Sequence, residues 1–136
     1  MSASFENLEV WKIGCRLAVE ITKVMGDCRF FSLRDQMMRS GISIPSNIAE
    51  GSERRTSKDF RHFIHIALGS AAELRTQSYI AREAEVISRE TAERWIADLK
   101  SISRMLQALS NTLDVAPDRQ PSTVNRQLKT GNRKRF

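Results

Sequence analysis

The stretch LRDQMMRSGISIPSNIAEGSERR, Leu33 to Arg55, decides the fold because, read as a helix, it has two unlike sides. At about 100° per residue, its polar side chains stack into one seam and its apolar side chains form rows beside it. The short neutral groups at the centre of the seam suit contact with another surface, but the solvated face of an ordinary bundle helix has the same spacing. The polar seam comprises Gln36, Ser40, Ser43, Asn47, Glu50 and Arg54, and the apolar rows comprise Met37, Gly41, Ile44 and Ile48, then Met38, Ile42 and Ala49.

Pro45 lies within this stretch, where a proline removes one backbone hydrogen bond and crowds the carbonyl four residues earlier. That carbonyl belongs to Gly41, and a glycine leaves the backbone room to bend. We therefore predict one kinked helix rather than two. Ser32 is expected to cap its N-terminus, and Gly51 to mark the end of its regular part.

The rest of the chain also favours helices. No segment alternates between polar and apolar residues as a half-buried strand does. Apolar stripes predict further helices near 7–25, 57–85 and 89–113, with caps at Thr56 or Ser57 and at Ser88. Short links then specify an all-α, antiparallel up-down-up-down four-helix bundle with a kinked second helix, over residues 1–116.

Each predicted helix has a set of positions expected to face the core or a neighbour. The first helix has two apolar stripes, so it should touch two other helices: Leu8, Trp11, Cys15, Ala18 and Met25 in one, and Val10, Leu17, Ile21 and Val24 in the other. The third has Phe60, Ile64, Ala67, Ala71, Leu74, Ser78 and Ala81, and the fourth has Ala92, Trp95, Leu99, Ile102, Leu106, Leu109 and Leu113. The small residues Gly69 and Ala72 lie on the opposite face of the third helix, which either meets another chain or is neutral.

The formal net charge of +6 is concentrated at the C-terminus, where residues 117–136 hold six basic residues against one acidic residue. We expect this segment to be a flexible, disordered basic tail. It can attract nucleic acid or another anionic surface, or it can be a solubilising end without a partner.

Composition also limits the location of the protein and its chemistry. Cys15 and Cys28 give neither a disulfide framework nor a metal-ligand spacing, and no cofactor motif is present. The N-terminus does not resemble a signal peptide, and no run reaches transmembrane length. We expect a cytoplasmic protein without a membrane contact.

The motif GISIPSNIAEG, from Gly41 to Gly51, together with IALGSAAEL, from Ile66 to Leu74, resembles a known family. The chain is similar, over about 5–113, to the four helix bundle protein family, also called the 23S rRNA intervening-sequence protein family. The residues that match the family motifs are Gln36, Arg39, Ser43, Asn47, Glu50, Gly51 and Glu73. The segment CRFFS, from Cys28 to Ser32, departs from the family's Phe-Pro and acidic pattern, and the basic tail lies outside it.

The resemblance implies a bacterial four-helix bundle that assembles as a homopentamer with a central channel. It also implies similarity to the accessory variability determinant of diversity-generating retroelements, which binds nucleic acid and a reverse transcriptase. Members are often encoded within inserts in bacterial 23S rRNA genes, which suggests a connection with RNA. The family has no catalytic residue to carry over.

Possible catalytic or metal-binding groups have simpler interpretations. His62 and His65 have a spacing that can share a metal, but a third ligand on a facing element is not evident. Glu50 and Glu73 could form a carboxylate pair for acid–base chemistry. Ion pairing with arginines such as Arg39 or Arg54 explains them at less cost, so we expect neither an enzyme nor a metal site.

Four basic residues gather around the predicted turn into the third helix: Arg54, Arg55, Lys58 and Arg61. In a closed ring this cluster would repeat and form a basic rim, although on one subunit it can equally be a solvated helix end. The hypothesis is a non-enzymatic homo-oligomeric scaffold that binds RNA or DNA through phosphates. The alternative is an oligomeric protein-interaction adaptor, such as an accessory subunit for a reverse transcriptase.

Overall fold

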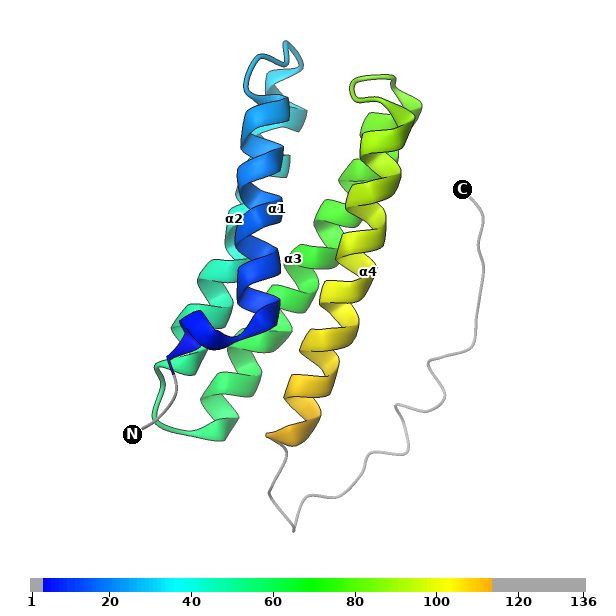
Figure 1. Ribbon diagram of the computed structural model, residues 1–136. Coiled ribbons are helices and arrows are strands. Elements are labelled where there is room, and N and C mark those ends of the chain that lie inside the picture. Colours follow the sequence, from blue (N-terminus) through cyan, green and yellow to red (C-terminus); the bar gives the residue numbers. More distant parts are fainter. Residues whose placement is uncertain (1–3, 114–136) are drawn as a thin grey trace.

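The computed structural model describes residues 4–113, and all regular structure in that range is helical. A short 3-10 helix, η1 (Phe5–Asn7), precedes α1 (Glu9–Met25), α2 (Phe31–Ser52), α3 (Ser57–Glu83) and α4 (Arg89–Thr112). The turns after α1 and α3 lie at one end of the bundle, and the turn after α2 lies at the other (Figure 1). The predicted up-down-up-down four-helix bundle is confirmed. The predicted basic tail and the domain boundary at 116 lie outside the described residues.

Helix α2 is continuous through Pro45, as predicted for one helix rather than two. Pro45 is buried against α1, where a Cβ added to Gly14 would lie 3.5 Å from the proline Cδ. The predicted cap at Ser32 is wrong, because the Phe30 carbonyl already accepts the Arg34 amide at 3.0 Å and the helix begins at Phe31. No side chain caps this N-terminus.

The third and fourth helices begin where the sequence predicts. Thr56 Oγ1 accepts the Asp59 amide at 3.1 Å, and Ser88 Oγ accepts the Thr91 amide at 3.0 Å. Each such cap stabilises a helix by about 1 kcal/mol. Helix α3 ends at Glu83, two residues earlier than predicted, because Glu85 adopts a left-handed φ of 59°. The Val86 amide then reaches back to the Ala81 carbonyl at 2.9 Å, which closes the helix end.

The core follows the predicted stripes of α3 and α4. Trp95, Leu99, Ile102 and Leu106 are fully buried, and Phe60, Leu109 and Leu113 are partly buried at the periphery. Burying a large apolar side chain stabilises the fold by roughly 1.5–3 kcal/mol. In α1 the second predicted stripe forms the core, except that Val24 is 43% exposed. The first stripe is only half-buried up to Ala18, because it borders the open side of the α1–α2 contact.

The sequence suggested that Gly51 ends the regular part of α2, but the helix continues to Ser52. It is instead a point of close approach between α2 and α3. A Cβ at Gly51 would lie 2.7 Å from Phe63 Cβ and 2.9 Å from Phe60 Cδ1. The absence of a side chain therefore lets α2 pack directly on the first turns of α3.

We expect Gly51→Ala to destabilise the protein by about 1–3 kcal/mol, because the added methyl group overlaps Phe63 and the helices must separate. The matched control is Gly69→Ala, in the middle of α3, where an added Cβ meets nothing within 4 Å. That change should stabilise the protein by about 0.5–1 kcal/mol through helix propensity. Urea denaturation of both variants measures the difference. Equal stability of the two would contradict the close packing at Gly51.

Candidate functional site

The basic residues predicted around the α2–α3 turn do lie together at one end of the bundle (Figure 1). Arg54 is held in place on both sides. Its Nη2 donates to Glu50 Oε2 at 2.8 Å, and its guanidinium carbon lies 4.7 Å from the centre of the Phe63 ring. This arginine is therefore ordered against the helix surface, with its charge partly balanced.

Arg54, Arg55 and Lys58 are all exposed, but Arg55 and Lys58 differ from Arg54 in forming no ion pair with any residue in 4–113. They flank Thr56, the N-cap of α3, where backbone amides of the first helical turn lack acceptors within the helix. Arg61, one turn further on, is half-buried. Glu53 and Asp59 are the acidic neighbours, so the turn keeps a net positive charge. Cations beside a helix N-terminus attract anions such as phosphate.

The polar seam of α2 makes contacts within the chain. Ser43 Oγ and Ser70 Oγ share a hydrogen bond of 2.8 Å, which joins α2 to α3. Asn47 Nδ2 donates to the Ser43 carbonyl at 2.8 Å and to Ser43 Oγ at 3.0 Å. Ser40 is buried with only 4% of its surface exposed. The centre of the seam thus holds α2 against its own neighbour, which is one of the two roles that the sequence left open.

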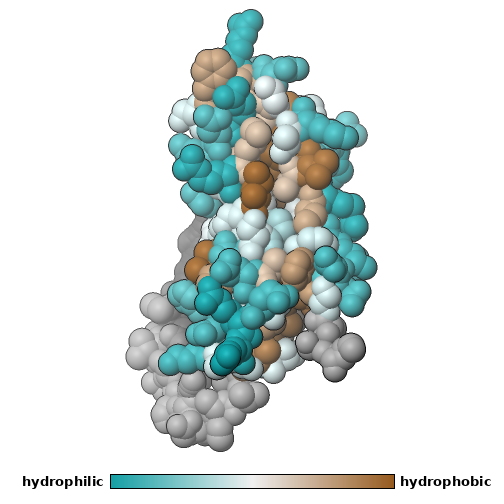
Figure 2. Space-filling view, turned by 90° about the vertical axis from the view of Figure 1, so that its left-hand side faces the viewer, coloured by the Kyte–Doolittle hydropathy of each residue, from teal (hydrophilic) through white to brown (hydrophobic). Residues whose placement is uncertain are grey.

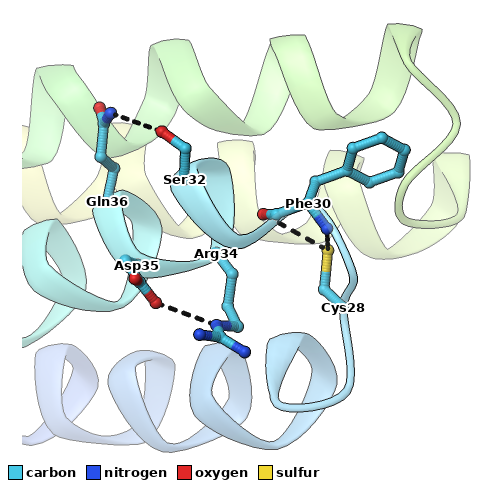
Figure 3. A network of polar contacts seen from close by, with 6 residues as sticks. All are labelled: Cys28, Phe30, Ser32, Arg34, Asp35 and Gln36. Carbon is cyan, nitrogen blue, oxygen red and sulfur yellow. Dashed lines mark hydrogen bonds and ion pairs between the residues drawn. The ribbon is translucent and has the colours of Figure 1, made fainter.

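The outer residues of the seam are closer to solvent. Gln36 Nε2 donates to Ser32 Oγ at 3.5 Å in the first turns of α2 (Figure 3). Arg39 and Glu73, both motif residues, are exposed and form no ion pair among the described residues. Glu50 pairs with Arg54 at 2.8 Å, which is one of the ion pairs that the sequence suggested for this carboxylate.

A carboxylate cluster that sequence reasoning missed lies where α1 meets α4. Arg94 donates to Glu20, and this ion pair links the two helices. Burial raises the pKa of the Asp98 carboxyl, and the nearby charge of Glu20 raises it further, against the opposing effect of Arg94 and Arg16. The free energy of unfolding therefore falls as the pH rises from the ordinary pKa of an aspartate to the raised pKa of Asp98. This cluster could not be predicted from sequence, because Glu20 lies more than 70 positions from its partners on α4 and no local pattern relates them.

An apolar groove runs along the α1–α2 contact and has a volume of about 430 Å³. Val19 and Ile42 stand at its edges, 54% and 51% exposed, although the sequence assigned Ile42 to an apolar row. Apolar side chains gather in a band along the middle of the left-hand side of the bundle (Figure 2). The groove is lined by Phe5, Trp11, Cys15, Ala18, Val19, Ile42, Pro45, Ser46 and Ala49.

The histidines are placed on the outside of α3. His62 and His65 are both exposed, and the His62 ring lies 5.3 Å from the Phe63 ring in an edge-on arrangement. Within residues 4–113, no three His, Cys, Asp or Glu side chains are grouped so that they could hold a metal ion. In the same range, no helix has the length and apolar character needed to cross a membrane.

Comparison with known proteins gives a family and a similar structure. The family model described as "23S rRNA-intervening sequence protein" matches residues 6–108. The crystal structure of a protein with unknown function from the S23 ribosomal protein family of Bacteroides thetaiotaomicron is similar, with a TM-score of 0.71 and 28% sequence identity. The match covers 74% of this chain and 97% of that chain. A search of curated proteins found no match.

We expect Ser43→Ala and Ser70→Ala to be coupled, because either change removes the hydrogen bond between the two hydroxyls, and Ser43 Oγ then keeps only the Asn47 amide. A double-mutant cycle by urea denaturation should give an interaction energy of about 0.5–1.5 kcal/mol. Ser43→Ala with Ser110→Ala is the control pair. Ser110 is buried on α4, which shares no close contact with α2. Additive effects in the Ser43–Ser70 cycle would contradict a stabilising hydrogen bond across α2 and α3.

Proposed function

The chain belongs to the 23S rRNA-intervening sequence protein family, and we propose that it is a non-enzymatic homo-oligomeric scaffold that binds RNA or DNA through phosphate contacts. The names of the family and of the S23 ribosomal protein family support a connection with RNA. The observation that carries the proposal is the pair Arg55 and Lys58, exposed beside the N-terminus of α3. Arg54 and Arg61 complete the phosphate-binding cluster.

The mechanism is neutralisation of the nucleic-acid backbone without reading of base edges. Arg54, held by Glu50 and Phe63, presents a fixed charge that loses little side-chain freedom on binding. Arg55 and Lys58 are free to follow the positions of successive phosphates. In a closed ring, which the family resemblance implies to be a pentamer, each subunit repeats the cluster, and weak contacts add to a useful affinity.

The apolar groove supports the oligomeric part of the proposal. A second copy of the chain is the occupant we assign to it, because apolar side chains line the groove and Val19 and Ile42 are both about half exposed. If the groove of one subunit binds a different surface of the next, the subunits are related by a repeated rotation. They form a ring when that rotation brings the last subunit back to the first.

We expect the double variant Arg55→Ala/Lys58→Ala to bind both RNA and DNA more weakly than the native chain, with little dependence on base sequence. Fluorescence anisotropy at several salt concentrations measures this. The slope of log K against log salt should fall by about 0.7–0.9 for each phosphate that the variant no longer neutralises. Lys12→Ala/Lys100→Ala, two exposed lysines on α1 and α4, is the matched control. Native affinity that is absent at low salt, or insensitive to salt, would exclude phosphate binding.

We expect Val19→Ser/Ile42→Ser to lower the mass of the assembly measured by light scattering, because it makes both edges of the groove polar. Val24→Ser is the matched control on α1, since Val24 is also exposed but does not line the groove. A native chain that is monomeric at all concentrations would refute the scaffold. An oligomer that the double variant retains would show that the subunits meet elsewhere.

The alternative function is an oligomeric adaptor that binds another protein, such as a reverse transcriptase. The apolar groove favours it, because such a surface suits a protein partner as well as a second copy. Pull-down after nuclease treatment separates the two functions. An adaptor keeps its protein partner, whereas a scaffold that holds partners through nucleic acid loses them.

A further inference from the structure

The turn between α1 and α2 exposes two consecutive aromatic side chains. Phe30 is 62% and Phe31 61% exposed, the highest values among the large apolar residues in 4–113. These residues belong to the segment where the sequence departs from the family's Phe-Pro and acidic pattern. They stand at the opposite end of α2 from the basic cluster (Figure 1). We refer to Cys28–Arg34 as the aromatic tip.

The aromatic tip is held by contacts of the Phe30 backbone and of the Phe31 ring. The Phe30 amide donates to Cys28 Sγ at 3.4 Å, and the Cys28 amide donates to the Met25 carbonyl at 3.0 Å. Figure 3 shows Phe30 on the turn, with its ring pointing away from these contacts. The Arg34 guanidinium lies 4.7 Å from the centre of the Phe31 ring and donates to Asp35. The Phe31 ring, which lies against Arg34, therefore loses little conformational freedom when it binds.

The tip combines aromatic rings with positive charge. Residues 23–35 contain Lys23, Arg29 and Arg34 against Asp27 and Asp35, and Asp35 pairs with Arg34. Lys23 and Arg29 are exposed and form no ion pair with any described residue. Aromatic side chains that stack on bases, next to cations that contact phosphates, are the combination by which proteins bind single-stranded nucleic acid.

We propose that the aromatic tip is a second nucleic-acid contact, on which Phe30 and Phe31 stack with unpaired bases of single-stranded RNA or DNA. Arg29 and Lys23 contact the adjacent phosphates. The inference rests on the proposed function and deepens it, because it selects single strands where the basic cluster alone accepts any backbone. Bases in a duplex are stacked on each other and offer no free face to the phenylalanine rings.

The two contacts engage different segments of the strand. The 22 residues of α2 separate them by roughly 33 Å at 1.5 Å per residue. Sites this far apart act independently, so changes at the tip and at the basic cluster should add in free energy. A charged cluster supplies salt-dependent affinity, and the tip supplies a preference for unpaired bases.

The test compares the full-length native chain with Phe30→Ala/Phe31→Ala on three probes: a single-stranded oligonucleotide, its duplex, and an abasic strand of equal length. We expect affinity for the base-bearing single strand to fall about 5- to 150-fold for each base that no longer stacks on a ring. Affinity for the duplex and the abasic strand should stay the same. Phe30→Trp/Phe31→Trp should keep the affinity, whereas Phe30→Leu/Phe31→Leu should lose it, because leucine is apolar but has no ring to stack.

Several results would overturn the inference while leaving the proposed function intact. These are salt-sensitive binding that Phe30→Ala/Phe31→Ala does not change, equal native affinity for abasic and base-bearing strands, or native affinity of the leucine variant for the base-bearing single strand. A fall in assembly mass in the alanine variant would instead make the tip a contact with a second copy. If the native chain binds none of the probes at low salt, the inference and the proposed function both fail. Thermal melting checks folding, which these exposed positions should leave unchanged.

Discussion

The close approach of α2 to α3 is the constraint on which the rest of the described structure depends. It requires a residue without a side chain at Gly51, where a Cβ would overlap Phe63. Further along the same contact, Ser43 and Ser70 share a hydrogen bond that satisfies two polar groups between the helices. Because this contact positions Phe63 at the surface, Arg54 finds both a ring and the Glu50 carboxylate to hold it. The turn that follows then carries Arg55 and Lys58 outward. The geometry of the basic cluster is therefore a consequence of helix packing.

The sequence predicted those features of the fold that local chemistry determines. The caps at Thr56 and Ser88 and the stripes of α3 and α4 depend on residues within a few turns of each other, and these predictions were correct. Ser32 failed as a cap because the preceding Phe30 carbonyl joins the helix first. Gly51 was assigned to a helix end, since sequence alone does not show that Phe60 and Phe63 would lie against it. Val24 has the spacing of a core residue but lies beyond the reach of a neighbouring helix.

In the candidate site, too, the features set by neighbouring residues were predictable and those set by helix packing were not. Four basic residues within eight positions of a turn must lie near each other, so their grouping could be predicted from sequence. That Arg54 is the one held by Glu50 and Phe63 depends on the packing of α2 on α3. The apolar groove could not be predicted, because it forms where residues of η1, α1 and α2 meet and leave space between them. The ion pair between Glu20 and Arg94 likewise requires the antiparallel arrangement of α1 and α4.

Helix α2 also determines how the two ends of the bundle relate to each other. A proline in a helix normally bends it or breaks it, at a cost of about 3 kcal/mol. Here Pro45 is buried against Gly14, whose small size lets α1 support the helix at the point where a backbone hydrogen bond is missing. Within one turn of Pro45, Ser43 joins the same segment to Ser70 of α3, and Asn47 donates to Ser43 inside α2. With contacts to both neighbours, α2 is continuous from Phe31 to Ser52, and the aromatic tip and the basic cluster lie at its two ends. A single strand bound as we propose would therefore meet the two contacts at a distance set by the length of α2.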